Sequence, residues 1–418
     1  EYLSRFAEKA ARGYAHGEAV QALNDALQHI DRMPADVRDL QRLQTVLALA
    51  DSMLPLGRIN ELLSLLPAEH DRVERLREPA LAARYYFILA RAYMLGNHRL
   101  VEESARRAIT EAERCGDSAT MGGAYAVLAV ACALLGQSST GIECGRRAIA
   151  LLETSPEQWS LSYACWALGL CCAQTGAFEE AITAEHHALS IAQEIGNAAL
   201  EVSAGWVIGI THAAMGDWDQ GILECQRAVQ AARDVLYRAI STGFLGFAYM
   251  EKGDSGAATA ALEEAIPLVC QFGMKQFEGW FTAFLAETHR LEGRLDRAEA
   301  LAGHACLIAA EANHGIGVGW AQQSLGRTAV ARRDLAKAMA RLEQALATFT
   351  TTHSRYECAR THVDLAAVCQ ARGDGEAAGR HLNEAYALFK ALDVPRYRER
   401  VEQLAAEWGM ALTSDSRS

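Results

Sequence analysis

Small and apolar residues recur along the chain at intervals that predict paired helices. Aligned on Gly176, the stretch LCCAQTGAFEEAITAEHHAL matches ITHAAMGDWDQGILECQRAV from Ile210 and FAYMEKGDSGAATAALEEAI from Phe247. From Gly57 to Gly373 the reference position recurs every 40 residues, with one interval of 39 and one of 37. It is occupied by Gly57, Gly96, Gly136, Gly176, Gly216, Gly253, Gly293, Arg333 and Gly373, and by Tyr14 in an N-terminal unit. We call this position the anchor; its recurrence predicts ten repeats.

Three further columns define each repeat. Alanine stands twelve residues after the anchor in nine of the ten units, with Glu69 as the exception. Leucine or isoleucine stands eight before the anchor, and glycine or alanine seven before it, in the seven units from Tyr125 onward. Glycine inside a helix costs about 1 kcal/mol relative to alanine, so its recurrence predicts two helices that cross closely. Each unit is predicted to be helix A, a turn at the anchor and helix B, with Gly116, Gly196, Gly273 and Gly315 ending helix B.

A helical hairpin that cannot bury its small-residue face alone is stabilised by stacking on the next one, so the fold class expected is all-α, a solenoid of about ten helix-turn-helix repeats. Leu-Gly before the turn, glycine at the turn, and alanine five and twelve residues later together resemble the tetratricopeptide repeat. That resemblance implies a right-handed superhelix. The chain departs from the family in its period, 40 residues instead of about 34, and in keeping the usual tyrosine four before the anchor only at Tyr249.

The domains expected are divergent helical hairpins over 1–75, a regular superhelix over 76–410 and a disordered tail over 411–418. The N-terminal FAEKAARGYAHGEAVQALNDAL, the LPLG hairpin and the terminal ALFKALDVPRYRERVEQL resemble the C-terminal repeat region of bacterial adenylate or guanylate cyclase–AAA ATPase signalling proteins. The repeat region of LuxR-type ATPase regulators is the second resemblance. Both imply a regulatory arm of a larger protein, with its own N-terminal ATPase or cyclase domains as partners, and we expect the sequence to be a piece of such a protein.

Charge and composition narrow the function. A net charge of −12 and a pI near 5.6 disfavour nucleic acid, whose binding depends on clustered Lys and Arg. Eleven cysteines without a CxxC pair favour a reducing, cytoplasmic location. The longest apolar run, 124–135, is shorter than a membrane span, so no membrane segment is expected.

The adjacent pairs Cys171–Cys172 and His186–His187 raise the question of a metal site. Cys172 shares a column with other small residues, and a buried free cysteine behaves as a small apolar side chain. His186 and His187 fall in columns of Arg, Gln and Glu, and adjacent helical residues point about 100° apart. We therefore expect buried thiols, solvated imidazoles and no metal. Phosphate loops, nucleophile elbows and HExxH pairs are absent from the sequence, so no enzyme activity, catalytic residue or cofactor is expected.

Helix A offers the candidate binding face. Positions 13, 10, 6 and 3 before the anchor share one side of a helix, opposite the leucine column. The partner-binding residues predicted there are Tyr163, Trp166, Trp206, Phe247, Met250, Trp280, Arg290, Trp320, Arg327 and Arg360. Aromatic residues and arginine often dominate interfaces, so the prediction is a groove for a peptide or partner domain with apolar anchors and some acidic character.

Packing of these aromatics inside the protein is the competing interpretation. A small-ligand sensor and a homodimer through the same face remain alternative functions. Trp218, at a turn, is expected to pack within its own hairpin.

Overall fold

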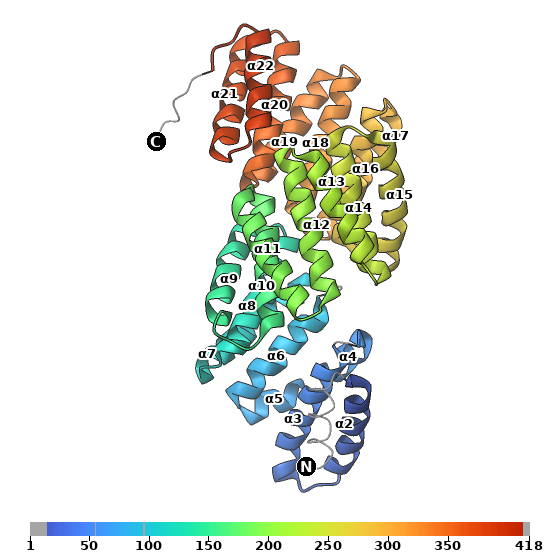
Figure 1. Cartoon of the computed structure of the whole chain (residues 1–418), viewed down its shortest axis with the longest axis vertical. Helices are drawn as coiled ribbons and strands as arrows, with labels where there is room; N and C mark the ends of the chain where they lie inside the picture. The colour runs from blue at the N-terminus through green and yellow to red at the C-terminus, as the bar shows by residue number, and fades with distance from the viewer. Residues whose placement is uncertain (1–14, 55, 95–96, 413–418) are drawn as a thin grey trace. The chain divides into compact units, whose positions relative to one another are not determined.

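The computed structural model describes residues 15–54, 56–94 and 97–412, and it is helical throughout, with no strand in these ranges. The helices are α2 His16–Ile30, α3 Ala35–Met53, α4 Ile59–Leu65, the 3-10 helix η1 Pro67–Glu69, α5 His70–Leu76, α6 Pro79–Tyr93, α7 His98–Cys115, α8 Ser118–Leu134, α9 Ser138–Leu152, α10 Gln158–Thr175, α11 Phe178–Glu194, α12 Ala198–Met215, α13 Trp218–Ala231, α14 Val235–Lys252, α15 Ser255–Gln271, α16 Lys275–Leu291, α17 Leu295–Glu311, α18 Gly315–Ala331, α19 Leu335–Thr351, α20 Arg355–Ala371, α21 Gly375–Ala391 and α22 Pro395–Glu407. The predicted all-α repeat fold is confirmed (Figure 1).

The chain forms two compact units. Unit 1 comprises Glu1–Ala131 with Arg146–Leu161, and unit 2 comprises Cys132–Gly145 with Ser162–Ser418. In unit 2, each helix from α11 to α22 packs against the next one in the chain, as Figure 1 shows for α12 to α17. The A helices α12, α14, α16, α18 and α20 also pack against one another in order. They form a continuous layer, on which the site described below is built.

Within unit 1, the side chain that breaks the alanine column is buried. Glu69 is 1% exposed. Its carboxylate accepts a hydrogen bond from Arg42 at 3.0 Å and forms an ion pair with Arg72. A buried carboxylate is tolerated when it is paired and hydrogen-bonded. The expected anchors Tyr14 and Gly96 lie outside the described residues, as do residues 413–418 of the expected disordered tail.

The predicted turns follow from one hydrogen-bond pattern. The anchor residue adopts a left-handed backbone, with φ of +90° at Gly216 and +87° at Gly253, and glycine tolerates this conformation best. The next amide then bonds to the carbonyl five residues back, as in Asp254 N to Tyr249 O at 3.0 Å. Asp254 also caps α15 by accepting from the Ala257 amide at 3.1 Å. Two residues therefore suffice to separate the end of α14 from the start of α15.

The expected crossing of helices A and B is confirmed at Gly209. A Cβ added to Gly209 on α12 would lie 3.0 Å from the backbone nitrogen of Cys225 and 3.0 Å from Gly221 O, and closer still to Cys225 Sγ. The alanine column is buried, with Ala188 at 0% exposure, and so is the leucine column except for the half-buried Leu245, with Leu365 at 0% exposure.

One predicted helix end is wrong. Gly116, Gly196 and Gly273 do adopt positive φ where helix B ends. Gly315, however, is the first residue of α18, and Asn313 takes the left-handed position with φ of +53°. Asparagine is one of the few residues other than glycine that visit this region readily, so glycine was not required there.

Helix α12 is the one helix in the described ranges that is long and apolar enough to cross a membrane by length and composition. It is mostly buried within the protein, at 61% of the tested window. Its apolar character is therefore accounted for by its place in the A-helix layer.

Segments of unit 2 that are far apart in the sequence also touch. The Arg396 guanidinium, at the start of α22, lies 4.2 Å from the Trp218 ring centroid and donates to Gly216 O. The rings of Phe178 and Tyr356 meet at 5.3 Å. Trp218, expected to pack within its own hairpin, thus also has a contact outside that hairpin, with Arg396. Unit 2 closes on itself through these contacts.

Candidate functional site: a groove along the A helices

Three adjoining cavities follow the A helices of unit 2. The polar cavity has a volume of about 400 Å³, and seven of its fifteen lining residues are charged; they come from α14, α16, α18, α20 and α22. The apolar pocket has a volume of about 60 Å³ and is lined mainly by aromatic rings. The connecting pocket, of about 30 Å³, shares Phe247, Phe284, Trp320 and Glu357 with the apolar pocket, and Met250, Glu287, Arg327 and Arg360 with the polar cavity. Together we call these three cavities the groove.

Aromatic rings from successive repeats form the apolar pocket. Trp280 on α16 and Trp320 on α18 meet edge to face at 5.7 Å, and Phe284 lies 5.3 Å from Trp320. Trp280 is 2% exposed and its indole nitrogen donates to His314 at 3.2 Å, which fixes the ring. Trp320 is only half-buried, so one part of it faces the pocket. Such rings offer a large, rigid contact area to a ligand.

Ion pairs fill the wall of the polar cavity. Arg327 donates to Asp364 at 2.7 Å and lies 3.3 Å from Glu287, which also accepts from Arg290 at 2.7 Å. Arg360 donates to Glu251 at 2.9 Å, across 109 residues of sequence. Charge-assisted hydrogen bonds of this kind hold side chains firmly when they are partly buried.

Burial and pairing set the ionisation of these acids. Burial raises the pKa of Asp364, and the nearby Arg327 only partly opposes it. Burial also acts to raise the pKa of Glu287, but the charge of Arg327 and the hydrogen bond from Arg290 outweigh it, so that pKa falls below its usual range. Glu287 therefore remains charged more readily than Asp364.

Glu357 differs from the other acids of the groove. It is 6% exposed, and its Oε2 has no hydrogen-bond partner among the described residues. Its Oε1 is 3.7 Å from Arg360, beyond good hydrogen-bonding distance. Burial raises the pKa of Glu357, with Arg360 and a hydrogen bond from Trp320 opposing the shift. A buried carboxylate oxygen without a hydrogen-bond partner is costly, so Oε2 of Glu357 calls for a ligand or a proton.

Seven of the ten predicted binding residues line the groove. Phe247 and Met250 are 8% and 7% exposed, and Trp280 and Trp320 face the apolar pocket. The remaining members of this set, which line the polar cavity, are Arg290, Arg327 and Arg360. The sequence pattern therefore brings these seven side chains together on neighbouring A helices.

The other three predicted residues lie off these cavities. Tyr163 and Trp166 are half-buried on α10, with ring centroids 5.3 Å apart. Trp206 is 2% exposed and stacks on Phe244 at 4.2 Å. For Trp206, the competing interpretation of packing inside the protein describes its place in the structure.

The expected preference for an acidic ligand loses its basis. It relied on Arg290, Arg327 and Arg360 as free positive charge, whereas each of the three is paired with a carboxylate. Glu251, which is paired with Arg360, also accepts a hydrogen bond from Tyr397 at 2.9 Å. The arginines thus hold the wall together and leave little positive charge for a ligand.

Several groove residues were missed by the sequence reasoning. Glu357 lies one helical turn before Arg360, on the same face, so extending the search to sixteen positions before the anchor would have found it. Phe284 lies nine before its anchor, next to the columns searched. Glu251 carries no such signal, because its pairing with Arg360 depends on how unit 2 closes.

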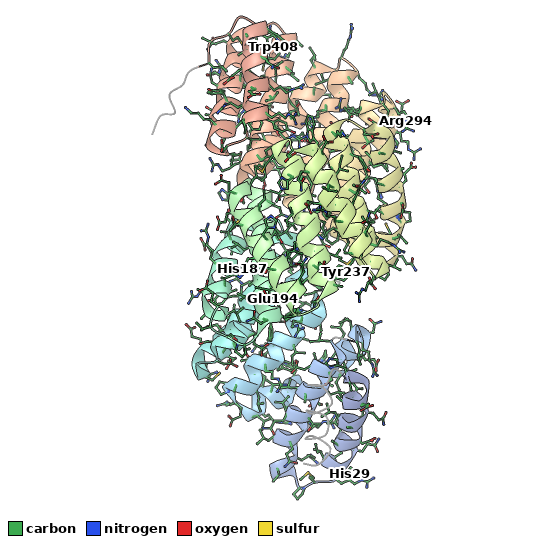
Figure 2. The ribbon with its side chains drawn as sticks, in the orientation of Figure 1. His29, His187, Glu194, Tyr237, Arg294 and Trp408 are labelled. Atoms are coloured by element: carbon green, nitrogen blue, oxygen red, sulfur yellow. The ribbon has the colours of Figure 1, made fainter. Side chains whose placement is uncertain are left out.

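The cysteine and histidine pairs lie where their columns predict. Cys171 and Cys172 are both 0% exposed, while His186 and His187 are exposed on α11, where Figure 2 labels His187. Within the described ranges, no three His, Cys, Asp or Glu side chains come together in a way that could hold a metal ion.

Comparison with known proteins gives the fold but no family. No protein-family model matches the chain, and no curated protein matches it. Among solved structures, a Rap protein complexed with Competence and Sporulation Factor has a TM-score of 0.64 at 13% identity, covering 88% of this chain and 99% of its own. The Rap conjugation gene regulator of plasmid pLS20, in complex with the Phr* peptide, has a TM-score of 0.54 at 11% identity, covering 87% and 96%. The apo quorum sensor NprR from B. thuringiensis has a TM-score of 0.53 at 14% identity, covering 80% and 98%.

At these identities the comparisons establish the fold alone. They confirm that the repeats are tetratricopeptide-like, and they do not extend to the cyclase–ATPase or LuxR-type attribution.

Proposed function

We propose that this chain is a protein-interaction module that binds a short peptide in the groove of unit 2. The observation that carries the proposal is the continuity of the groove, which runs from an aromatic pocket into a polar cavity of about 400 Å³ through shared residues. An extended peptide presents apolar and polar side chains along one line, which matches such a groove. Two solved structures of similar fold hold a named factor or peptide, and this supports the same ligand class here.

The module acts in regulation through the closure of unit 2. Glu251 on α14 holds both Arg360 on α20 and Tyr397 on α22, and these contacts border the polar cavity. A ligand that binds beside them changes the closure of unit 2 only to the extent that it binds one conformation of the unit more tightly than another. Transmission to ATPase or cyclase domains elsewhere in a longer cytoplasmic protein, and the absence of enzyme activity in this chain, remain parts of this proposal.

A small-ligand sensor is the second candidate. The feature that favours it is the apolar pocket, whose volume of about 60 Å³ suits a small group. Dimerisation through the predicted binding face is the third, and a mass that rises with concentration would reveal it.

Peptide binding is tested with a library of short linear peptides screened against the full chain, followed by titration calorimetry of the strongest binder. We expect Trp320→Ala to weaken binding at least tenfold, because Trp320 lines two of the three cavities. Trp159→Ala is the matched control: Trp159 is half-buried in unit 1, where Arg91 lies 4.3 Å from its ring centroid. A true ligand should also raise the melting temperature, since it binds the native state. Equal weakening by both substitutions, or a library without binders, would overturn the proposal.

A further inference from the structure

The buried charges along the groove do not balance. Four carboxylates, from Glu251, Glu287, Glu357 and Asp364, face three largely buried guanidinium groups, from Arg290, Arg327 and Arg360. Each guanidinium forms a direct ion pair with Glu251, Glu287 or Asp364, and Glu357 is left over. Arg400, the remaining cation at the polar cavity, is exposed, and Glu357 does not line that cavity. The groove thus contains one surplus buried carboxylate, Glu357, whose Oε2 has no hydrogen-bond partner among the described residues.

That surplus charge lies where a ligand can reach it. Glu357 lines both the apolar pocket and the connecting pocket, and its unpartnered Oε2 is buried there. Trp280, Trp320 and Tyr356 line the same apolar pocket. A carboxylate beside aromatic rings is the arrangement that stabilises an organic cation, through an ion pair and through the negative faces of the rings. An anionic ligand group would meet a like charge at this point, and a neutral group would leave the carboxylate uncompensated.

The size of the space restricts the cation. The apolar and connecting pockets have volumes of about 60 and 30 Å³. A single water needs roughly 10 to 15 Å³ on the same kind of measure, so the space holds a few heavy atoms. A primary ammonium group with its adjacent methylenes fits this description.

We propose that the pocket at Glu357 receives a primary ammonium group, offered by the amino terminus or a lysine side chain of the bound peptide. The ammonium pairs with Glu357, and the rings of Trp280, Trp320 and Tyr356 surround its methylenes. The inference rests on the proposed peptide-binding function and specifies the ligand chemistry of that groove. It reverses the acidic preference that the arginines alone suggest.

The test uses n-butylammonium and its neutral counterpart 1-butanol as probes, with ligand-observed saturation-transfer NMR on the full chain. We expect n-butylammonium to bind at least tenfold more tightly than 1-butanol. Glu357→Gln removes the charge while keeping the shape, and should abolish this preference. Glu185→Gln is the matched control, because Glu185 is another buried carboxylate of unit 2 with oxygens that have no hydrogen-bond partner in the described structure, yet it lines none of the three cavities. It should leave the preference unchanged.

A parallel arm separates the inference from the proposed function. Library peptides with a free amino terminus are compared with acetylated, lysine-free ones. Peptides that bind equally well in both forms would overturn the ammonium site and leave peptide binding standing. A library without binders, together with Glu357-dependent binding of n-butylammonium, would overturn peptide binding and leave the ammonium site standing. Equal binding of the two small probes to the unaltered chain would overturn the ammonium site without recourse to any variant.

Discussion

Gly209→Leu is expected to lower the free energy of unfolding by about 1 to 3 kcal/mol or more, the usual cost of forcing extra atoms into a packed core. The reason is the crossing of α12 and α13, where even a Cβ would approach the backbone at Cys225 N and Gly221 O to 3.0 Å. Backbone atoms cannot move aside as a flexible side chain can. The two helices would have to separate, and the A-helix layer would separate with them.

The measurement is chemical denaturation followed by circular dichroism. Gly303→Leu is the matched control, since Gly303 also lies inside a helix but has nothing within 4 Å of an added Cβ. We expect it to be neutral or mildly stabilising, because leucine is a better helix former than glycine. Coinciding denaturation curves for the two variants would show that the predicted register of the repeat is wrong.

The second large effect is expected at Glu185, where Glu185→Leu should raise the free energy of unfolding at pH 7 by about 1 to 3 kcal/mol, the usual penalty of an unsatisfied buried polar group. Glu185 is 0% exposed, and both its carboxylate oxygens lack a hydrogen-bond partner in the part of the chain that the structure describes. It faces Gly169 across the crossing of α10 and α11. Leu262 and Leu342 occupy the same place opposite Gly246 and Gly326, so leucine fits this crossing.

The pH dependence of stability gives this prediction a second readout. Burial raises the pKa of Glu185 well above its usual value, so the folded state holds the proton more strongly than the unfolded state. The contribution of this proton to the free energy of unfolding is complete below the pKa of Glu185 in the unfolded chain, about 4.3. It is lost as the pH rises through the pKa of Glu185 in the folded protein. Glu185→Leu should remove this pH-dependent loss of stability. Glu179→Leu, an exposed site on the same helix, should leave the pH profile unchanged; a flattened profile in both variants would contradict the assignment to Glu185.

The sequence predicts the repeat well because its determinants are local. The turn at Gly253 requires only a left-handed residue and a capping aspartate next to it, and both are visible in one stretch of sequence. The close crossing at Gly209 likewise involves two helices of one hairpin. Gly315 shows the limit of this reasoning, since a nearby asparagine can do what glycine does.

The groove could be predicted only in part. Periodicity placed Trp280 of α16, and Trp320 and Arg327 of α18, on the groove side of their helices. It could do so because the side of a helix on which a residue lies depends only on its position within that helix. The pairing of Arg360 with Glu251 joins residues 109 positions apart. Such pairing depends on the small rotation between successive repeats, which accumulates along the solenoid and is not encoded in any one column. The surplus charge at Glu357 could therefore be recognised only after the arginines had been assigned to their partners.

The central claim, a peptide bound in the groove of unit 2, is tested most directly by photo-cross-linking. The strongest library binder would carry a diazirine at each position in turn, and adducts on the full chain would be mapped by mass spectrometry. We expect adducts on groove residues such as Met250, Phe284 and Trp320, lost when unlabelled peptide competes. Competable adducts confined to unit 1, or to the exposed sides of the B helices, would contradict the claim.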